Sequence, residues 1–311
     1  MLRDIAGEAA SIKSADKKLS AAVKGVFDER NIPVFAAVCY YSVDDCINVE
    51  VSAAKDRMKN IDIRSVTEEL SDVCGCDFSL PAKRETENAI RMFFSEKPLI
   101  EADFGEISIN AAGEKFCGDS SERFIDQSGR ANMILSDGMG SGDYAALDSM
   151  MTAGFIAKLV KAGFRFGAAI KLVNSALLLK SEDESLATVD AFSMNLYTGR
   201  ADFYKSGAAP SFVIKNGKAS KIESISMPIG ILGEAEYEQN SIILGAEDIV
   251  LLVSDGVTAT GEDWIMSEMR CLSENSAKEI AKSIAETAYK RRNDGHSDDI
   301  TVMAMKLEKS E

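Results

Sequence analysis

The sequence predicts an α+β protein, in which an antiparallel β-sandwich is flanked by helical layers and preceded by a small α/β segment. Two observations favour this class. From residue 99 onward, short apolar runs with period-two alternation recur between turn residues, most clearly at Asn216-Gly217, a strong hairpin signal. Two stretches of helical pattern, at 143–180 and 275–292, interrupt the strands and are expected to cover the sheets.

Residues 1–98 differ in pattern from the rest and are predicted to form a separate segment that ends at Pro98. Apolar residues over 1–30 are spaced three, four or seven apart, which predicts an amphipathic helix. Its apolar face needs a partner, and a second copy of the chain, giving a homodimer, is one candidate. The elements expected after it are a strand pair over 34–42 and 46–54 with a turn near 43–45, and helices around 63–73 and 82–95.

Residues 99–311 are predicted to form the second domain. Its expected strands are 99–110, the approach to FCGDSSERF (116–124), 186–196, 201–207, a hairpin over 211–222, 247–256 and 300–307, with turns at Gly113 and Thr198-Gly199. The helical pattern over 143–180 falls into two pieces separated near Gly163–Gly167. Asn275 is the expected N-cap of the last helix.

Composition restricts the class of partner. Lys and Arg total 35 against 50 Asp and Glu, a formal net charge of −15, which works against binding to nucleic acid or anionic lipid and suits divalent cations. The longest apolar runs are far shorter than the roughly 20 residues that a membrane helix needs, so the chain is predicted to be soluble and cytoplasmic. The six scattered cysteines are interpreted as reduced thiols, because Cys74-Gly75-Cys76 lacks the second pair of a zinc site.

Acidic residues recur at or beside the ends of predicted strands, each next to glycine or another turn former. They are Asp119 in CGDSS, Asp137 in SDGMG, Asp255 in SDGVT and the pair Asp298-Asp299 in GHSDDITV. Strand ends in one sandwich can converge on one edge, where carboxylates repel each other unless a cation lies between them. Oxygen ligands select Mg²⁺ or Mn²⁺, and two ions about 3.5 to 4 Å apart would lower the pKa of a shared water and direct it at phosphorus.

Other interpretations of the glycine-rich stretch are less favourable. GSGDYA at 140–145 fits a dinucleotide fingerprint, but residues 149–181 contain no Asp or Glu for a ribose and no second strand. A calcium loop would need Asp or Asn where Met139 stands. A plain turn is the more common role for any single Asp-Gly, but four acidic sites of one type favour a shared chemical role.

The order GDS, SDGMGSG, SDGVT and DDITV resembles the metal-dependent PPM (type 2C) serine/threonine protein phosphatases, and more closely the phosphatase portion of bacterial stage II sporulation protein E. The stretches ATVDAFSMNLYTGRADFYKSGAAPSFV and MPIGIL are similar as well, so the resemblance covers about residues 99–311. Residues 1–98 are more weakly similar to the regulatory region that precedes the phosphatase. Because larger family members carry membrane spans, the resemblance also allows membrane tethering through a longer protein.

The resemblance implies two Mn²⁺ or Mg²⁺ ions in one site, with Asp137 as the residue that bridges them. The implied ligands are Asp119, Asp137, Gly138 through its carbonyl, Asp255 and Asp298. Asp298 is preferred to Asp299 because the family's ligand is the first residue of this dipeptide. The implied substrate is a phosphoserine on an anti-sigma-factor antagonist, whose dephosphorylation activates a sporulation sigma factor, and the helices at 143–180 are the implied switch elements.

One departure from the family pattern matters. Many type 2C enzymes have histidine where this chain has Met139, so a general acid is missing and a rate about 10²-fold lower is expected. The single histidine, His296, is a candidate substitute, although a solvated loop histidine is the more common role.

Asp190 faces inward on its predicted strand, where a local backbone hydrogen bond is the favoured role, and Lys205 is expected to be solvated. The alternatives to a protein phosphatase are a phosphatase-like scaffold and an enzyme for small phosphate esters.

Overall fold

The computed structural model describes residues 12–42, 46–58, 61–111, 116–126, 128–139, 143–180, 186–292 and 298–310. The chain divides into two compact units, Met1–Pro98 (unit 1) and Leu99–Glu311 (unit 2). Each unit has a hydrophobic core of its own. Among the described residues, no helix is both long and apolar enough to cross a membrane.

Unit 1 is a five-stranded antiparallel sheet with two helices on one face. Its elements are β1 (Ile12–Asp16), α2 (Lys17–Glu29), β2 (Val34–Ser42), β3 (Ile47–Ala54), the short 3₁₀ helix η1 (Lys55–Met58), α3 (Ile63–Cys74), β4 (Ala82–Glu85) and β5 (Ala89–Ser95), in the sheet order β1-β2-β3-β5-β4. Phe27 of α2 and Leu70 of α3 are fully buried against this sheet. Asp16 begins α2 because its carboxylate accepts the N–H groups of Lys18 and Leu19, both at 2.9 Å.

Two sequence predictions for unit 1 are wrong. Residues 12–16 form β1 and not the middle of a long helix, so the helix of this region is restricted to α2, and residues 1–11 lie outside the described residues. Residues 82–95 form the antiparallel pair β4–β5 and not a helix. The charged residues of this stretch fit a solvated helix, but Ile90, Met92 and Phe94 alternate toward the core, which is the period of a strand. The strands at 34–42 and 46–54 and the helix at 63–73 are confirmed.

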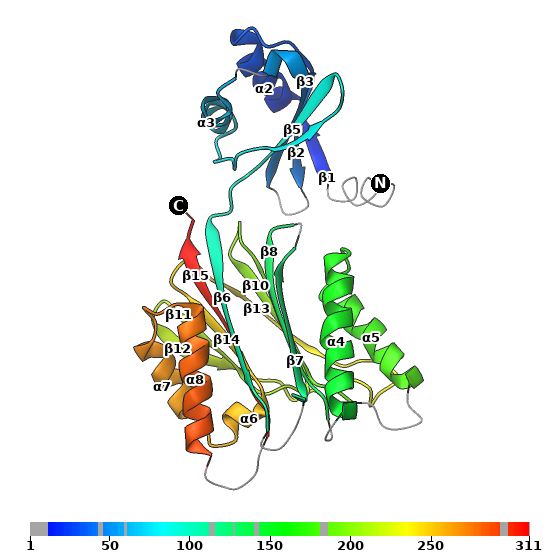
Figure 1. The fold of residues 1–311 in the computed structure, drawn as a ribbon, viewed down its shortest axis with the longest axis vertical. Coiled ribbons are helices and arrows are strands. Elements are labelled where there is room, and N and C mark those ends of the chain that lie inside the picture. Colours follow the sequence, from blue (N-terminus) through cyan, green and yellow to red (C-terminus); the bar gives the residue numbers. More distant parts are fainter. Residues whose placement is uncertain are drawn as a thin grey trace. The chain divides into compact units, whose positions relative to one another are not determined.

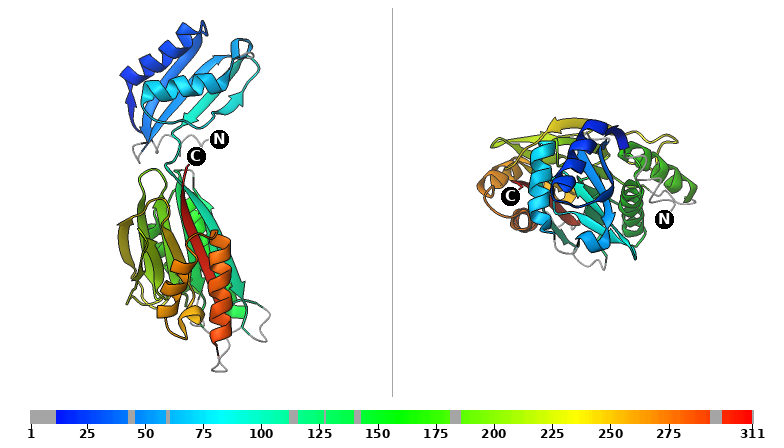
Figure 2. Two further views of the ribbon diagram at one scale, coloured as in Figure 1. Left: turned by 90° about the vertical axis from the view of Figure 1, so that its left-hand side faces the viewer. Right: turned by 90° about the horizontal axis from the view of Figure 1, so that it is seen from above.

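Unit 2 is built on two stacked antiparallel sheets (Figure 1, Figure 2). The first sheet, in the order β13-β10-β9-β8-β7, contains β7 (Asp119–Ile125), β8 (Arg130–Asp137), β9 (Val189–Asn195), β10 (Arg200–Ser206) and β13 (Glu238–Ile243). The second sheet, in the order β12-β11-β14-β15-β6, contains β6 (Ile100–Ile109), β11 (Ser211–Lys215), β12 (Lys218–Ile222), β14 (Ile249–Val253) and β15 (Ile300–Lys309). Met133, Phe203 and Met303 are among the fully buried side chains between the sheets.

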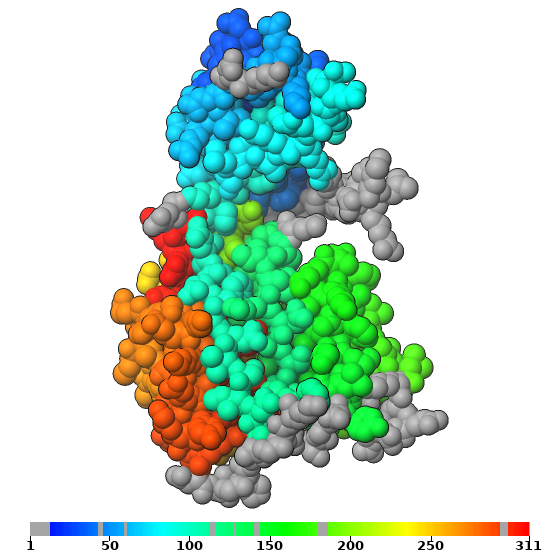
Figure 3. Space-filling model, viewed as in Figure 1, coloured from blue at the N-terminus to red at the C-terminus, as the bar shows by residue number. Residues whose placement is uncertain are grey.

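Helices cover both outer faces of the sandwich. The helices α4 (Asp143–Lys161) and α5 (Phe166–Lys180) pack on the first sheet, and α6 (Asp255–Thr258), α7 (Asp263–Cys271) and α8 (Ala277–Arg291) pack on the second. Strands β6 and β7 are visible between the two helical layers (Figure 3). The predicted antiparallel sandwich flanked by helices is therefore confirmed, as are the two helices within 143–180.

Local sequence signals explain several ends of these elements. Asn216 and Gly217 have φ angles of 49° and 74°, the left-handed values of the predicted two-residue hairpin between β11 and β12. The N-cap of α8 is Ser276 and not Asn275, because Ser276 and Glu279 form a capping box. The sequence patterns did not indicate β13, α6 or α7, which are short or carry mixed polar and apolar residues.

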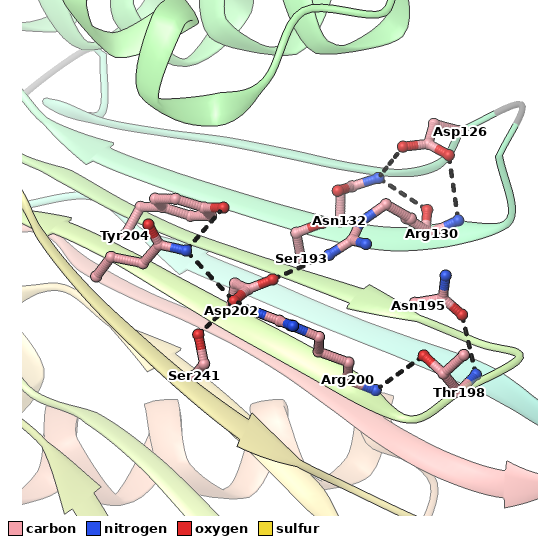
Figure 4. Close-up of polar contacts among 11 residues, drawn as sticks. Asp126, Arg130, Asn132, Ser193, Asn195, Thr198, Arg200, Asp202, Tyr204 and Ser241 are labelled. Atoms are coloured by element: carbon pink, nitrogen blue, oxygen red, sulfur yellow. Dashed lines mark hydrogen bonds and ion pairs between the residues drawn. The ribbon is translucent and has the colours of Figure 1, made fainter. Parts of the chain in front are cut away.

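A polar network crosses the first sheet on the face that carries α4 and α5. The Arg130 guanidinium donates to Ser193 Oγ at 3.0 Å and to Asp202 Oδ2 at 3.2 Å (Figure 4). Ser241 of β13 donates to the other carboxylate oxygen of Asp202. The network therefore joins β8, β9, β10 and β13, and it leaves the Asp202 charge compensated by a cation of the chain.

Candidate functional site

Two of the candidate aspartates lie opposite each other at the end of the first sheet. Asp119 opens β7 and Asp137 closes β8, and the antiparallel register of these strands makes the two residues direct partners. The Asp137 backbone is fixed from the other side, where its N–H donates to Thr188 Oγ1 at 2.9 Å. Asp119 is buried and Asp137 is half-buried.

The turn after Asp137 requires glycine. A Cβ atom on Gly138 would lie 1.9 Å from the carbonyl oxygen of Ala145 in the first turn of α4, so no larger residue fits there. The Met139 N–H donates to the Leu186 carbonyl at 3.0 Å, on the β9 side of β8. Because N–H and C=O point in opposite directions across a trans peptide, the Gly138 carbonyl points to the other side, toward β7.

The second sheet contributes the other two aspartates at the same end of the sandwich. Asp255 is the first residue of α6, one residue after the end of β14 at Val253, and Asp298 precedes β15. Both residues are exposed. Ser254 and Thr301 hold these segments together, since the Ser254 N–H donates to the Thr301 carbonyl at 3.0 Å and the Thr301 N–H donates to Ser254 Oγ at 2.8 Å.

Asp298 and Asp299 have different environments. The Asp299 carboxylate is buried, and its two oxygens accept the backbone N–H groups of Ala111, at 2.7 Å, and Gly118. These bonds tie Asp299, which directly precedes β15, to Ala111 and to Gly118, which directly precedes Asp119. The Asp298 carboxylate is exposed and accepts the Asp299 N–H at 2.9 Å. The Asp299 carboxylate thus has a structural role, whereas the Asp298 carboxylate faces solvent.

The aspartates of this end repel one another. Burial, partly offset by the Thr301 and Ser254 hydroxyls and reinforced by Asp299 and Asp255, raises the pKa of Asp119 to about 7. Burial and then repulsion from the other four carboxylates raises the pKa of Asp137 to about 8. Desolvation and the charge of Asp298 also raise the pKa of Asp255. Each carboxyl group therefore lies within the electrostatic influence of its neighbours, although they come from both sheets.

The residues present fit a divalent cation. Asp119 Oδ2 is buried and has no hydrogen-bond partner, which is costly for a carboxylate unless a cation coordinates it. Among the described residues, however, no three carboxylate, thiol or imidazole groups are arranged so that they could already hold a metal ion. The carboxylates converge on one end without closing around a point.

Three further residues are candidates from the sequence, namely His296, Lys205 and Asp190. His296 lies outside the described residues. Lys205 is fully buried and not solvated, and its Nζ lies 2.7 Å from Asp190 Oδ2 between the sheets. Asp190 accepts the Ser211 hydroxyl at 2.7 Å, so its partners are side chains of other strands and not local backbone. Both default expectations for these residues are therefore wrong, because their partners are distant in sequence.

Several known proteins are similar to this chain in sequence. The family model described as Stage II sporulation protein E (SpoIIE) matches residues 127–308, more than half of the chain. The chain is 31% identical over 212 residues to stage II sporulation protein E of Priestia megaterium, covering 66% of this chain and 36% of that protein. It is 22% identical over 284 residues to phosphoserine phosphatase RsbU of Bacillus subtilis (strain 168), covering 86% and 79%. The chain thus spans about a third of the Priestia relative.

Solved structures share the fold. The structure of the PP2C phosphatase domain and a fragment of the regulatory domain of SpoIIE from Bacillus subtilis has a TM-score of 0.68 at 23% identity, covering 95% of this chain and 89% of that chain. RsbX in complex with magnesium has a TM-score of 0.56 at 19% identity, covering 73% and 100%. These observations show that the chain belongs to the stage II sporulation protein E family and has the fold of the PPM (PP2C) phosphatases.

Proposed function

We propose that unit 2 is a metal-dependent phosphoserine/phosphothreonine protein phosphatase. The single observation that carries this proposal is the buried, unpartnered Oδ2 of Asp119, which lies at the end of the sandwich where Asp137, Asp255 and Asp298 also converge. A carboxylate in that position needs a cation, and the chain supplies none within ion-pair distance among its described residues. The family supports the assignment of phosphate ester chemistry to such a site.

The proposed ligands of two Mn²⁺ or Mg²⁺ ions are Asp119, Asp137, the Gly138 carbonyl, Asp255 and Asp298. Two such metal ions in one site would lower the pKa of a bound water molecule and neutralise charge on a phosphoryl group. Asp137 is the proposed bridge, as the family resemblance implies. It is the direct strand partner of Asp119, and the other four carboxylates all raise its pKa. Asp299 keeps the backbone around Ala111 and Gly118 in place.

The leaving seryl oxygen needs a proton, and Met139 cannot donate one. Met139 is 48% exposed, so bulk water reaches this position. Protonation by solvent is less effective than by a positioned acid, and a turnover about 10²-fold below that of an enzyme with histidine there is expected.

The proposed substrate is a phosphorylated anti-sigma-factor antagonist, whose dephosphorylation would activate a sporulation sigma factor. We propose control by unit 1 and by α4 and α5, since Gly138 packs directly on α4. Movement of α4 would therefore displace the carbonyl next to Asp137. Several apolar side chains of these helices, including Met150 and Leu172, are exposed and available to a partner.

The test is turnover of a phosphoserine peptide and of a phosphoprotein with Mn²⁺. Asp137→Ala is expected to lower the turnover rate by on the order of 10³-fold, as the loss of a preorganised charge-stabilising group does. Asp263→Ala, which changes an exposed aspartate of α7, is the matched control and should leave the rate unchanged. Equal turnover by Asp137→Ala and wild type would exclude this site. A chain beginning at residue 99 tests control by unit 1, and an unchanged rate there would argue against it.

The alternative is a phosphatase-like scaffold that acts by partner binding or oligomerisation. The observation that favours it is the exposed apolar surface of α4 and α5, which includes Met150 and Leu172. A scaffold would fail to turn over any phosphoprotein at millimolar Mn²⁺, while a phosphatase specific for small esters would hydrolyse those alone.

A further inference from the structure

Arg292 connects two of the segments that carry candidate ligands. It directly follows α8, and its guanidinium donates to three backbone carbonyls. One terminal nitrogen, Nη1, donates to the Asp298 carbonyl, and the other, Nη2, donates to the Gly256 carbonyl at 2.9 Å and more weakly to the Asp299 carbonyl at 3.4 Å. A single side chain thus joins the first turn of α6 to the residues before β15.

The space around this contact is filled. A Cβ atom on Gly256 would lie 2.2 Å from Arg292 Nη2 and 2.0 Å from the Asp299 carbonyl oxygen. Gly256 is therefore the residue that lets the α6 backbone, the β15 lead-in and the guanidinium approach so closely. Displacement of one of these three segments requires movement of the other two.

The contacts of Arg292 are with carbonyls and not with carboxylates. Among the described residues, Arg292 donates hydrogen bonds to backbone carbonyls and forms no ion pair with a carboxylate oxygen. The planar guanidinium presents two nitrogens in a fixed fork, which suits the bridging of two backbone segments. A lysine ammonium is a single point on a flexible stem and lacks this geometry.

We propose that Arg292 is a positioning residue that holds Asp255 and Asp298 at the separation needed to bind divalent cations. This inference rests on the proposed function. Two ionised carboxylates repel each other, and the hydrogen bonds from Arg292 to the backbone beside Asp255 and at Asp298 restrain the movement of these segments. Groups that orient metal ligands without touching the metal typically change metal affinity by 10- to 100-fold when removed.

The experiment measures Mn²⁺ binding to the full chain directly, by electron paramagnetic resonance titration, with no substrate present. Arg292→Met is expected to raise the Kd for Mn²⁺ by about 10-fold or more. Arg292→Lys should lie between wild type and Arg292→Met, because it keeps the charge and loses the fork. The matched control is Arg291→Met, one residue earlier, where the guanidinium lies over the Trp264 ring with 5.3 Å to its centroid. This control should bind Mn²⁺ as wild type does.

Phosphopeptide kinetics separate this role from two others. A positioning role predicts that high Mn²⁺ restores most of the turnover of Arg292→Met with little change in KM for the peptide. A raised KM with an unchanged Mn²⁺ Kd would assign Arg292 to substrate binding and overturn the inference. Two other results would assign Arg292 a general folding role and overturn the inference. One is an equal loss of Mn²⁺ affinity in Arg291→Met. The other is a circular dichroism spectrum of Arg292→Met that shows lost structure, together with no recovery of affinity in Arg292→Lys. Wild-type protein that neither binds Mn²⁺ nor hydrolyses the peptide would overturn the proposed function itself.

Discussion

Asp190 and Asp119 are both buried aspartates of the first sheet of unit 2, yet only Asp190 has a cation of the chain beside it. Asp190 is 1% exposed, and the fully buried Lys205 lies 2.7 Å from its Oδ2. Ser211 bridges the two, as it accepts from Lys205 Nζ and donates to Asp190 Oδ2. The charges inside the sandwich are thus neutralised within the chain, although Asp190 Oδ1 itself has no hydrogen bond.

Asp119 has no such compensation. Its Oδ2 lacks a partner, and the charged groups that act on it are aspartates. The same strand architecture therefore contains one carboxylate whose counter-charge is built in and another whose counter-charge must come from outside. The difference indicates that the Asp190–Lys205 ion pair has a structural role, whereas the uncompensated carboxylate of Asp119 is suited to binding a cation.

The largest expected effect is from Lys205→Met, which leaves the Asp190 charge buried without its cation. Removing one partner of a buried ion pair is strongly destabilising, so a loss of about 3 kcal/mol in the free energy of unfolding is expected from urea denaturation. Mn²⁺ should not restore this stability, because Lys205 is not at the carboxylate end.

The matched control is the double variant Lys205→Met with Asp190→Leu. It removes both charges and should recover most of the stability, as apolar replacements of buried pairs do. A single variant as stable as wild type would show that the pair contributes nothing, and the comparison with Asp119 would lose its basis.

The next effect is on the pH dependence of the metal-free protein. The pKa of Asp119 is raised to about 7 and that of Asp137 to about 8, from an ordinary value of 3.8. The folded state therefore holds these protons more tightly than the unfolded state, and their contribution to stability is complete below about pH 4 and is lost as the pH rises to about 8. We therefore expect the unfolding free energy of the metal-free protein to decrease from pH 5 to pH 8.

Saturating Mn²⁺ should flatten or reverse this dependence, because the ion binds the ionised carboxylates and replaces their protons. Urea denaturation at a series of pH values, with and without Mn²⁺, measures both curves. Identical curves under the two conditions would contradict a cation site at this end of the sandwich.

Elements with strong local patterns could be predicted from the sequence. The helices α4 and α5 are long and carry few charges, and the turn at Asn216-Gly217 uses the residues that its positive φ angles require. The strands β4 and β5 could not, because Lys83, Arg84 and Glu85 are exposed and resemble a solvated helix face. These residues form strands because β5 pairs with the edge of β3 and β4 pairs with β5. No local sequence pattern indicates that this edge is present.

The candidate site was predictable only in part for the same reason. Asp119, Asp137 and Asp255 could be located at strand ends from their Asp-Gly and Gly-Asp neighbours, but the direct pairing of Asp119 with Asp137 depends on strand register. The side chain of Lys205 resembled a solvated lysine next to a turn, since its partners Asp190 and Ser211 lie on neighbouring strands. The sequence therefore indicated which residues carry charge but not which charges are compensated.

The smallest expected effect is from Asp119→Asn, which removes a charge while preserving the shape of the side chain. At pH 8, where most Asp119 is ionised, the metal-free variant should be about 1 kcal/mol more stable than wild type, because a charge is no longer buried and repulsion from Asp299 and Asp255 is relieved. At pH 5, where Asp119 is already protonated, the two proteins should be equally stable. Mn²⁺ should stabilise the wild type and have little effect on the variant. Asp190→Asn makes the same chemical change on the same sheet, and it should be destabilising at both pH values because it strands the Lys205 charge. If both substitutions changed stability in the same direction, compensation by the chain would not distinguish the two aspartates.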